Sequence, residues 1–144
     1  MKTWVKLLIG ISVTVITAAI IIYFFVYNKP HPDYANLDVE FSMQAAALFD
    51  EFSADGTAAG SKYIGKMVGI NGPITRVEQS DSLVTIVFVI RKGEFGDEGL
   101  RCSMLPSSAE VARKLQPGAD VKIKGYCTGF TGDVVMEECT FYNE

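Results

Sequence analysis

The sequence predicts a mainly β domain, a five-stranded Greek-key barrel, preceded by an amphipathic helix and by an N-terminal transmembrane helix. Three patterns lead to this fold class. Residues 7–27 carry no charge, apolar residues then recur at helical spacing, and beyond residue 63 they recur at every second position. With the uncharged run set aside, roughly 115 residues remain, which suffice for one compact domain but not for two.

Residues 7–27 are long enough to cross a hydrocarbon core of about 30 Å as a helix that rises about 1.5 Å per residue. Lys2 and Lys6 precede this run, and two tyrosines lie toward its far end. Because positive charge favours the cytoplasmic side, residues 1–6 are expected in the cytoplasm and the later residues outside it. A cleaved signal peptide is the alternative, since residues 17–19 are small, but cleavage there would leave a strongly apolar end.

A linker is expected over residues 28–40, because two prolines and several turn-forming residues stop the helix there. His31 lies between those prolines, with no other histidine and no cysteine nearby. It is therefore expected to be a solvated linker side chain and not a metal ligand.

A helical segment is predicted over residues 41–62, and its first helix has Ser42 as the expected N-cap. Its apolar residues recur at three- and four-residue steps and are Phe41, Ala45, Leu48, Phe49 and Phe52. Because this stripe needs an apolar surface to bury against, we expect the helix to cover one mouth of the barrel.

Five strands are predicted within residues 63–144. Their ranges are 67–77, 83–91, 100–105, 121–127 and 134–142, with a short helix, capped by Ser107, between the third and the fourth. The first strand contains glycines and a proline, which a flat interior strand would not tolerate but a coiled barrel strand uses for a bend or bulge. The polar turn EQSDS predicts a hairpin between the first two strands.

This order of three strands, a helix and a final hairpin resembles the five-stranded OB barrel. Two segments, KYIGKMVGINGPI (62–74) and GYCTGFTGDVVMEECTF (125–141), resemble the tRNA_anti-like family of OB domains found in Bacteroidetes. Members of that family often carry an N-terminal membrane or lipid anchor. The resemblance covers about residues 40–142 and implies the OB fold and an anchored domain, but no particular activity.

The resemblance to OB barrels implies a ligand face on the second and third strands, together with the loops that join strands one to two and four to five. The residues expected there are Arg76, Gln79, Ser82, Phe88, Arg91, Arg101, Phe130 and Asp133. Single-stranded nucleic acid needs aromatic platforms among basic residues, so Phe88 or Phe130 beside the arginines would supply a weak version of such a site.

The three cysteines are expected to face inward, because alternation along the strands places each of them with apolar neighbours. Buried free thiols that only pack are one prediction. The alternative is a disulfide of Cys139 with Cys102 or Cys127, because the fifth strand of an OB barrel lies between the third and the fourth, and an extracytoplasmic location would permit it. No CxxC pair is present, which disfavours structural zinc and thioredoxin-type chemistry.

The sequence offers few groups for catalysis. The single histidine lies in the linker, and no phosphate-binding P-loop, HExxH or GxSxG motif is present. The adjacent acidic pairs point in different directions on a strand or helix and are typical of solvated surface. We therefore predict no catalytic residues, no metal site and no cofactor.

Net charge and topology together indicate the function class. The chain has 13 basic and 17 acidic residues, and without Lys2 and Lys6 the balance is 11 against 17, or −6. A phosphate-backbone binder is expected to carry the opposite sign. We therefore predict a membrane-tethered, non-catalytic binding or assembly module on the periplasmic side of the inner membrane, with a protein, peptide, glycan or small molecule as its ligand and nucleic acid disfavoured. The alternatives are a single-stranded nucleic-acid-binding OB protein with a cytoplasmic barrel, and a redox protein that uses its cysteines.

Overall fold

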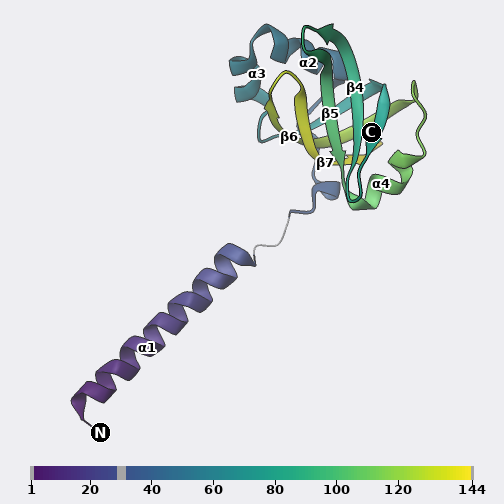
Figure 1. Ribbon diagram of the computed structural model, residues 1–144. Coiled ribbons are helices and arrows are strands. Elements are labelled where there is room, and N and C mark those ends of the chain that lie inside the picture. Colours follow the sequence, from purple (N-terminus) through teal and green to yellow (C-terminus); the bar gives the residue numbers. More distant parts are fainter. Residues whose placement is uncertain (1, 29–31, 144) are drawn as a thin grey trace. The chain divides into compact units, whose positions relative to one another are not determined.

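The computed structural model describes residues 2–28 and 32–143, which fall into two compact units, Met1–Pro32 and Asp33–Glu144 (Figure 1). Each unit is described by itself below. The predicted linker histidine, His31, lies outside the described residues.

The N-terminal unit is one apolar helix of 25 residues, formed by α1 (Thr3–Ile22) and the π-helical turn η1 (Tyr23–Tyr27). The hydroxyl of Thr14 donates a hydrogen bond to the carbonyl of Gly10 (2.9 Å), and Thr17 makes the equivalent bond one turn later. These polar groups are thus satisfied within the helix, as an apolar environment requires. The helix is long and apolar enough to cross a membrane, but a signal sequence meets the same criteria. Tethering and topology therefore stay predictions.

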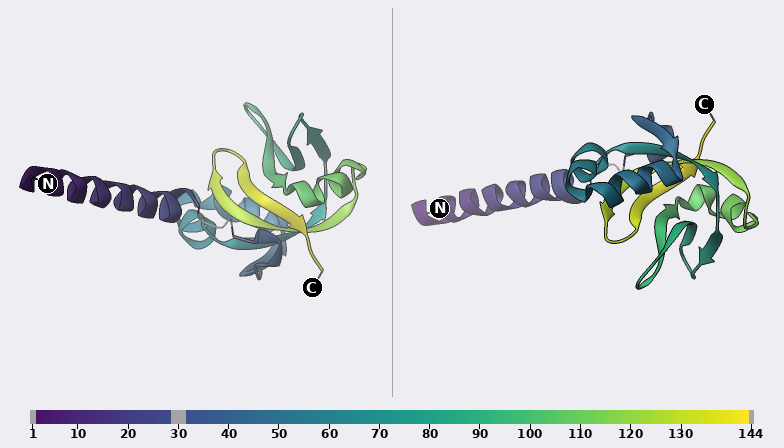
Figure 2. Two further views of the ribbon diagram at one scale, coloured as in Figure 1. Left: turned by 90° about the horizontal axis from the view of Figure 1, so that it is seen from below. Right: turned by 90° about the horizontal axis from the view of Figure 1, so that it is seen from above.

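The second unit is built on a sheet with the strand order β1-β2-β6-β7-β5-β4-β3 (Figures 1 and 2). The strands are β1 (Phe41–Gln44), β2 (Met67–Pro73), β3 (Arg76–Gln79), β4 (Val84–Gly93), β5 (Gly96–Met104), β6 (Asp120–Phe130) and β7 (Val134–Phe141). β1 runs parallel to β2 and β5 parallel to β7, and the other neighbours are antiparallel. The mainly β class is confirmed, but the sheet has seven strands where five were predicted.

The strand β1 is one source of the difference. The prediction of a helix that starts at residue 41 with Ser42 as its cap is wrong, because these residues pair with β2, with Phe41 opposite Val68 and Met43 opposite Ile70. The side chains of Phe41 and Met43 both pack against the core. Phe41 and Ala45 are four apart, as on one face of a helix, but Phe41 and Met43 are two apart, as on one face of a strand, and pairing with the edge of β2 decides between them.

The predicted first strand, residues 67–77, is divided into β2, which pairs with β6, and β3, which pairs with β4. Gly72 has φ +146°, and Pro73, the last residue of β2, has no N–H to donate. The N–H of Ile74 donates to the residue before β6 (3.0 Å), and that of Thr75 donates to β4 (2.9 Å). The chain thus turns a corner, as the glycines predicted. The sheet ends at β1 and β3 with no ladder between them, so the predicted closed barrel is not confirmed.

The helix α2 (Ala45–Ala54) lies against β2, β4 and β5, followed by α3 (Gly56–Tyr63). Its buried side chains are Ala45, Leu48, Phe49 and Phe52. Asp55, between the two helices, accepts hydrogen bonds from the N–H groups of Thr57 (3.1 Å) and Ala58 (3.0 Å) and is therefore the N-cap of α3. The apolar stripe is buried against the sheet, as the sequence predicted for these four residues.

Two shorter helices complete the unit, η2 (Tyr34–Asn36) and α4 (Pro106–Arg113). The N-cap of α4 is Leu105 and not Ser107, because Pro106 takes the first helical position, where its fixed φ suits the helix. The buried hydroxyls of Ser108 and Thr140 share a hydrogen bond of 2.6 Å, which joins α4 to β7.

Candidate functional site: a charged sheet face and a cavity

A group of charged side chains lies on the outer side of β3 and β5. We call it the arginine face, and it consists of Arg76, Glu78, Asp97, Arg101 and Asp133. Alternation along β3 puts Arg76 and Glu78 on the outer side, while Val77 packs against the core. In the register of the sheet, Arg76 and Arg101 flank Val87, which is only 4% exposed.

Each arginine of this face is held by two carboxylates. Glu78 bridges both, since one of its oxygens accepts from Nε of Arg76 (3.0 Å) and the other from Nη1 of Arg101 (2.8 Å). Asp133 accepts from Nε of Arg101 (3.1 Å), and Asp97 lies 3.4 Å from Nη1 of Arg76. Each guanidinium group is therefore held between two carboxylates.

The electrostatics of the arginine face favour the fully charged state. The hydrogen bond from Arg76 lowers the pKa of Glu78, partial burial opposes this effect, and the bond from Arg101 adds to the lowering. The hydrogen bonds that Arg101 donates to Glu78 and Asp133 raise its pKa. Three carboxylates therefore face two guanidinium groups, a net charge of −1. This negative balance disfavours a phosphate on the arginine face.

The remaining predicted polar residues are dispersed. Gln79 ends β3, and Ser82 lies in the loop after it, both exposed beside the arginine face. Arg91 belongs to a different neighbourhood, because its Nε lies 2.6 Å from a carboxylate oxygen of Glu98 and its guanidinium lies 5.2 Å from the ring centre of Phe49 in α2.

Of the two predicted aromatic platforms, one is buried and the other is half-buried. Phe88 is 1% exposed and belongs to the core, because β4 turns Ile86 and Phe88 inward. The ring of Phe130 is half-buried and packs on Phe52 (5.4 Å between ring centres) and Phe49 (6.3 Å). The expectation of an exposed ring is therefore wrong for Phe88, while a ligand role for Phe130 stays a prediction.

Two residues of the arginine face, Glu78 and Asp97, were missed by the sequence analysis, and so was the backbone contact from Gly99 to Asp133. Glu78 follows Arg76 by two positions in a strand, so alternation alone could have placed it on the same side. The N–H of Gly99 donates to Asp133 (2.8 Å), and Asp97 reaches Arg76 across the sheet. These two contacts depend on strand neighbours that no local pattern reveals.

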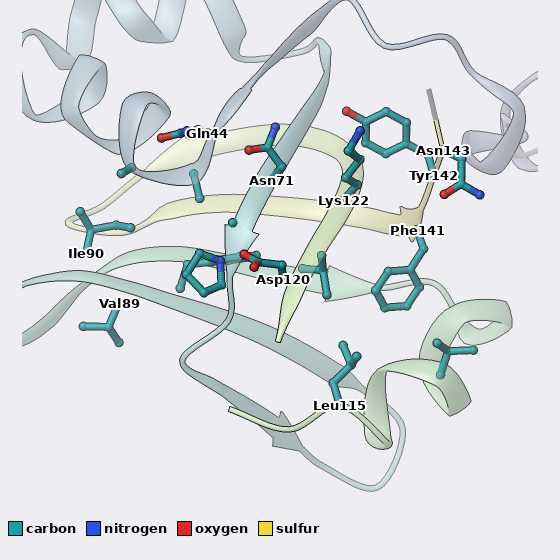
Figure 3. A pocket seen from close by; sticks show the side chains of 17 residues that line it. Gln44, Asn71, Val89, Ile90, Leu115, Asp120, Lys122, Phe141, Tyr142 and Asn143 are labelled. Carbon is teal, nitrogen blue, oxygen red and sulfur yellow. The ribbon is translucent and has the colours of Figure 1, made fainter. Parts of the chain in front are cut away.

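A cavity of about 920 Å³ opens where β2 and β4 separate (Figure 3). Its apolar wall includes Ala45, Ala46, Val89, Ile90, Leu115 and Phe141, and its polar groups include Gln44, Asn71, Asp120, Lys122 and Asn143. Of the predicted ligand residues, only Phe88 lines it. The volume is within the usual range for small-molecule and peptide sites.

All three cysteines, Cys102, Cys127 and Cys139, are free and buried, so the predicted disulfide is not formed in the structure. Burial raises the pKa of Cys127 to about 11, and burial followed by a hydrogen bond with Cys102 raises that of Cys139. A reactive thiol needs the opposite shift and access to solvent. Among residues 2–28 and 32–143, no cluster of His, Cys, Asp or Glu side chains is arranged to hold a metal ion.

The sequence matches the tRNA_anti-like family over residues 1–140. The chain belongs to this family. The family resemblance of the segments at 62–74 and 125–141 is thereby confirmed, while the Bacteroidetes type stays a prediction. No curated protein sequence matches the chain.

One solved structure supports the OB fold of this tRNA_anti-like chain. A candidate nucleic acid-binding lipoprotein from Klebsiella pneumoniae matches with a TM-score of 0.54 and 17% identity, over 80% of this chain and 100% of its own. Two weaker likenesses are asparaginyl-tRNA synthetase from Pyrococcus horikoshii (TM-score 0.38, 18% identity, 57% of this chain and 20% of its own) and the S. pombe Stn1–Ten1 complex (TM-score 0.38, 14% identity, 54% and 59%). At these identities the comparison shows the fold alone.

Proposed function

We propose that this tRNA_anti-like chain is a non-catalytic binding module, tethered to the inner membrane by its apolar helix, with the OB domain in the periplasm. The observation that carries the proposal is the 25-residue helix Thr3–Tyr27, with a mean hydropathy of 2.5. Two basic residues, Lys2 and Lys6, lie at its N-terminal end, against one, Lys29, after its C-terminal end. This two-to-one excess favours a cytoplasmic N-terminus.

We further infer that the sheet acts as an OB barrel in which β2 and β3 together are the first strand. The corner at Ile74 and Thr75 supports this inference, because the N–H of Ile74 donates to the residue before β6, whereas the N–H of Thr75 donates to β4. The covalent chain then connects the two ends of the ladder β2-β6-β7-β5-β4-β3. The shallow outer surface over β4 and β5 becomes the OB ligand face.

Binding is favoured over catalysis because the charged side chains of the arginine face already form ion pairs with one another. Arg101 is held by Glu78 and Asp133, and the pKa shifts of Glu78 and Arg101 keep these ion pairs charged. A protein, peptide, glycan or small ligand with hydroxyl, amide or basic groups can use the carboxylates as acceptors. The pKa of Glu78 is shifted down and that of Arg101 is shifted up, so neither group is tuned to take or give a proton near neutral pH.

A nucleic-acid ligand is the second candidate function, because the Klebsiella pneumoniae structure is described as a candidate nucleic acid-binding lipoprotein. A fluorescein-labelled dT12 oligonucleotide, titrated at low salt and followed by anisotropy, separates the two. Our proposal expects no binding below about 100 µM, since Arg76 and Arg101 are neutralised by carboxylates. Micromolar binding that weakens steeply with salt would favour the nucleic-acid function.

The location is tested by labelling engineered cysteines with a membrane-impermeant maleimide in spheroplasts of a bacterial host. The three native thiols are 0% exposed and give little background. Phe95, which is 100% exposed, is replaced in Phe95→Cys, and the N-terminal end is reported by Thr3→Cys, which keeps Lys2 and Lys6. We expect label on Phe95→Cys in intact spheroplasts, and on Thr3→Cys only after lysis. The reverse pattern would place the OB domain in the cytoplasm and refute the proposed location.

A further inference from the structure

The strand β4 has one edge that is only partly paired. β4 spans Val84–Gly93, but β3 pairs with it only as far as Val87. Thr75 extends the contact by one step, because its N–H donates to Val87 and its hydroxyl accepts from the N–H of Val89 (2.9 Å each). Beyond Val89, no strand within residues 2–28 and 32–143 pairs with this edge.

The divergence of β2 leaves this edge unpaired. At the corner, β2 turns to β6, and Pro73 faces Asp120 instead of β4. The space between the separating strands is the 920 Å³ cavity, with Gly72 and Pro73 on one wall and Val89 and Ile90 on another. We call this space the seam cavity; Figure 3 shows it between the strands.

The chemistry of the seam cavity is that of a peptide site. Three primary amides line it, Gln44, Asn71 and Asn143, and none of their side chains has a hydrogen-bond partner in the described part of the chain. A primary amide both donates and accepts, as a peptide group does. One acid, Asp120, and one base, Lys122, also line the cavity, so its side chains carry no net charge.

The size of the cavity also fits an extended chain. A residue in a strand occupies about 160 Å³, given a rise of about 3.3 Å, a strand spacing of about 4.8 Å and a sheet spacing of about 10 Å. A volume of about 920 Å³ therefore holds between five and six residues. The edge of β4 that stays open beyond Val89, residues 90–93, supplies four positions for pairing, and Phe88, Val89 and Ile90 of this strand line the cavity.

We propose that the seam cavity binds an extended, uncharged peptide segment with apolar side chains, which pairs with the open edge of β4 as an added strand. Its apolar side chains pack on Ile90, Leu115 and Phe141, and its peptide groups bond to the amides of Gln44 and Asn71. The proposal rests on the proposed binding role, but not on the periplasmic location, so the labelling experiment and the experiment below can fail independently.

The probes are fluorescein-labelled, capped hexapeptides in which threonine alternates with valine, leucine or phenylalanine, titrated against the full chain in nanodiscs. We expect at least one of them to bind with a Kd below about 100 µM. Ala46→Trp, which fills the cavity from α2, is expected to weaken this binding at least tenfold. Ala47→Trp is the matched control, because Ala47 is exposed on the same helix and does not line the cavity.

Two further measurements keep the result interpretable. Hydrogen exchange of residues 90–93 is expected to slow when peptide binds, a sign of strand pairing that binding elsewhere would not produce. If Ala46→Trp fails to fold, Asn71→Leu, which keeps the volume but removes an amide, is expected to weaken peptide binding. Decanoate serves as an acyl-chain probe. The proposal is overturned if no hexapeptide binds below 1 mM, if decanoate binds and peptides do not, or if Ala46→Trp and Ala47→Trp bind equally well.

Discussion

Replacing Phe49 by alanine is expected to lower the melting temperature of the OB domain by about 12–20 °C. The Phe49 side chain is 0% exposed, and its ring centre lies 6.3 Å from that of Phe130 and 5.2 Å from the guanidinium of Arg91. Truncation of a buried phenylalanine costs about 3–5 kcal/mol. For a domain of this size, 1 kcal/mol shifts the Tm by about 4 °C.

Scanning calorimetry of the full chain in detergent measures this shift, and Phe95→Ala is the matched control. The two variants make the same chemical change, but Phe95 is 100% exposed and loses no packing. The Tm of Phe95→Ala is therefore expected to fall by less than about 2 °C. Phe49→Asp is expected to be more destabilised than Phe49→Ala, because it buries an unpaired carboxylate. If Phe49→Ala and Phe95→Ala melt together, α2 does not pack on the sheet and the core described above is wrong.

Three other predictions concern the sheet. Because folding lowers the pKa of Glu78, its charged form stabilises the fold above the unfolded pKa, and this stabilisation is lost as the pH falls through the folded pKa. Urea unfolding should therefore show that Glu78→Gln lowers the free energy of unfolding by at most about 1 kcal/mol at pH 7 and does not change it near pH 2. Gly99→Ala should unfold at much lower urea than Gly129→Ala, because a Cβ at Gly99 overlaps the carbonyl oxygen of Phe88, whereas one at Gly129 has open space; equal midpoints would contradict this packing. Titration with a thiol reagent at pH 8 should find no reactive cysteine in the native chain and three after unreduced denaturation, since all three are buried and free; a count of one would reveal a disulfide.

The elements predicted from the sequence are those whose signal is local and long. The apolar run at 7–27 and the alternating strands at 83–91 and 121–127 are present in the structure, because each pattern extends over several turns or residue pairs. The buried stripe of α2 was also predicted correctly at Leu48 and Phe52. Periodicity is sufficient to predict a helix or strand where one face of that element must be buried.

The errors come from places where a neighbour in space decides the local conformation. Residues 41–44 fit a helix by spacing, but the free edge of β2 makes them a strand. Residues 67–77 form an unbroken β pattern, yet the chain turns at Ile74 because the first half of this segment pairs with β6 and the second half pairs with β4. Neither partner can be read from the segment itself.

The candidate site was predicted in part. Arg76, Arg101 and Asp133 do come together, but the prediction treated the arginines as free cations, whereas Glu78 neutralises both. The exposure of Phe88 depended on the inward or outward phase of β4, which alternation alone leaves undetermined. The seam cavity had no sequence signal, since it arises from the angle at which two strands separate.

The strand β1 sets how the OB domain would respond to a force applied at the N-terminal end of its sheet. It is the first strand after the apolar helix, and its four residues run parallel to β2 in a continuous ladder from Phe41 to Gln44. The preceding residue, Glu40, donates its N–H to Met67 (2.9 Å), and Lys124 donates a hydrogen bond to the carbonyl of Leu37 (2.8 Å). A force directed along this strand would shear all these bonds at once instead of breaking them one by one, so β1 would resist being pulled from the sheet.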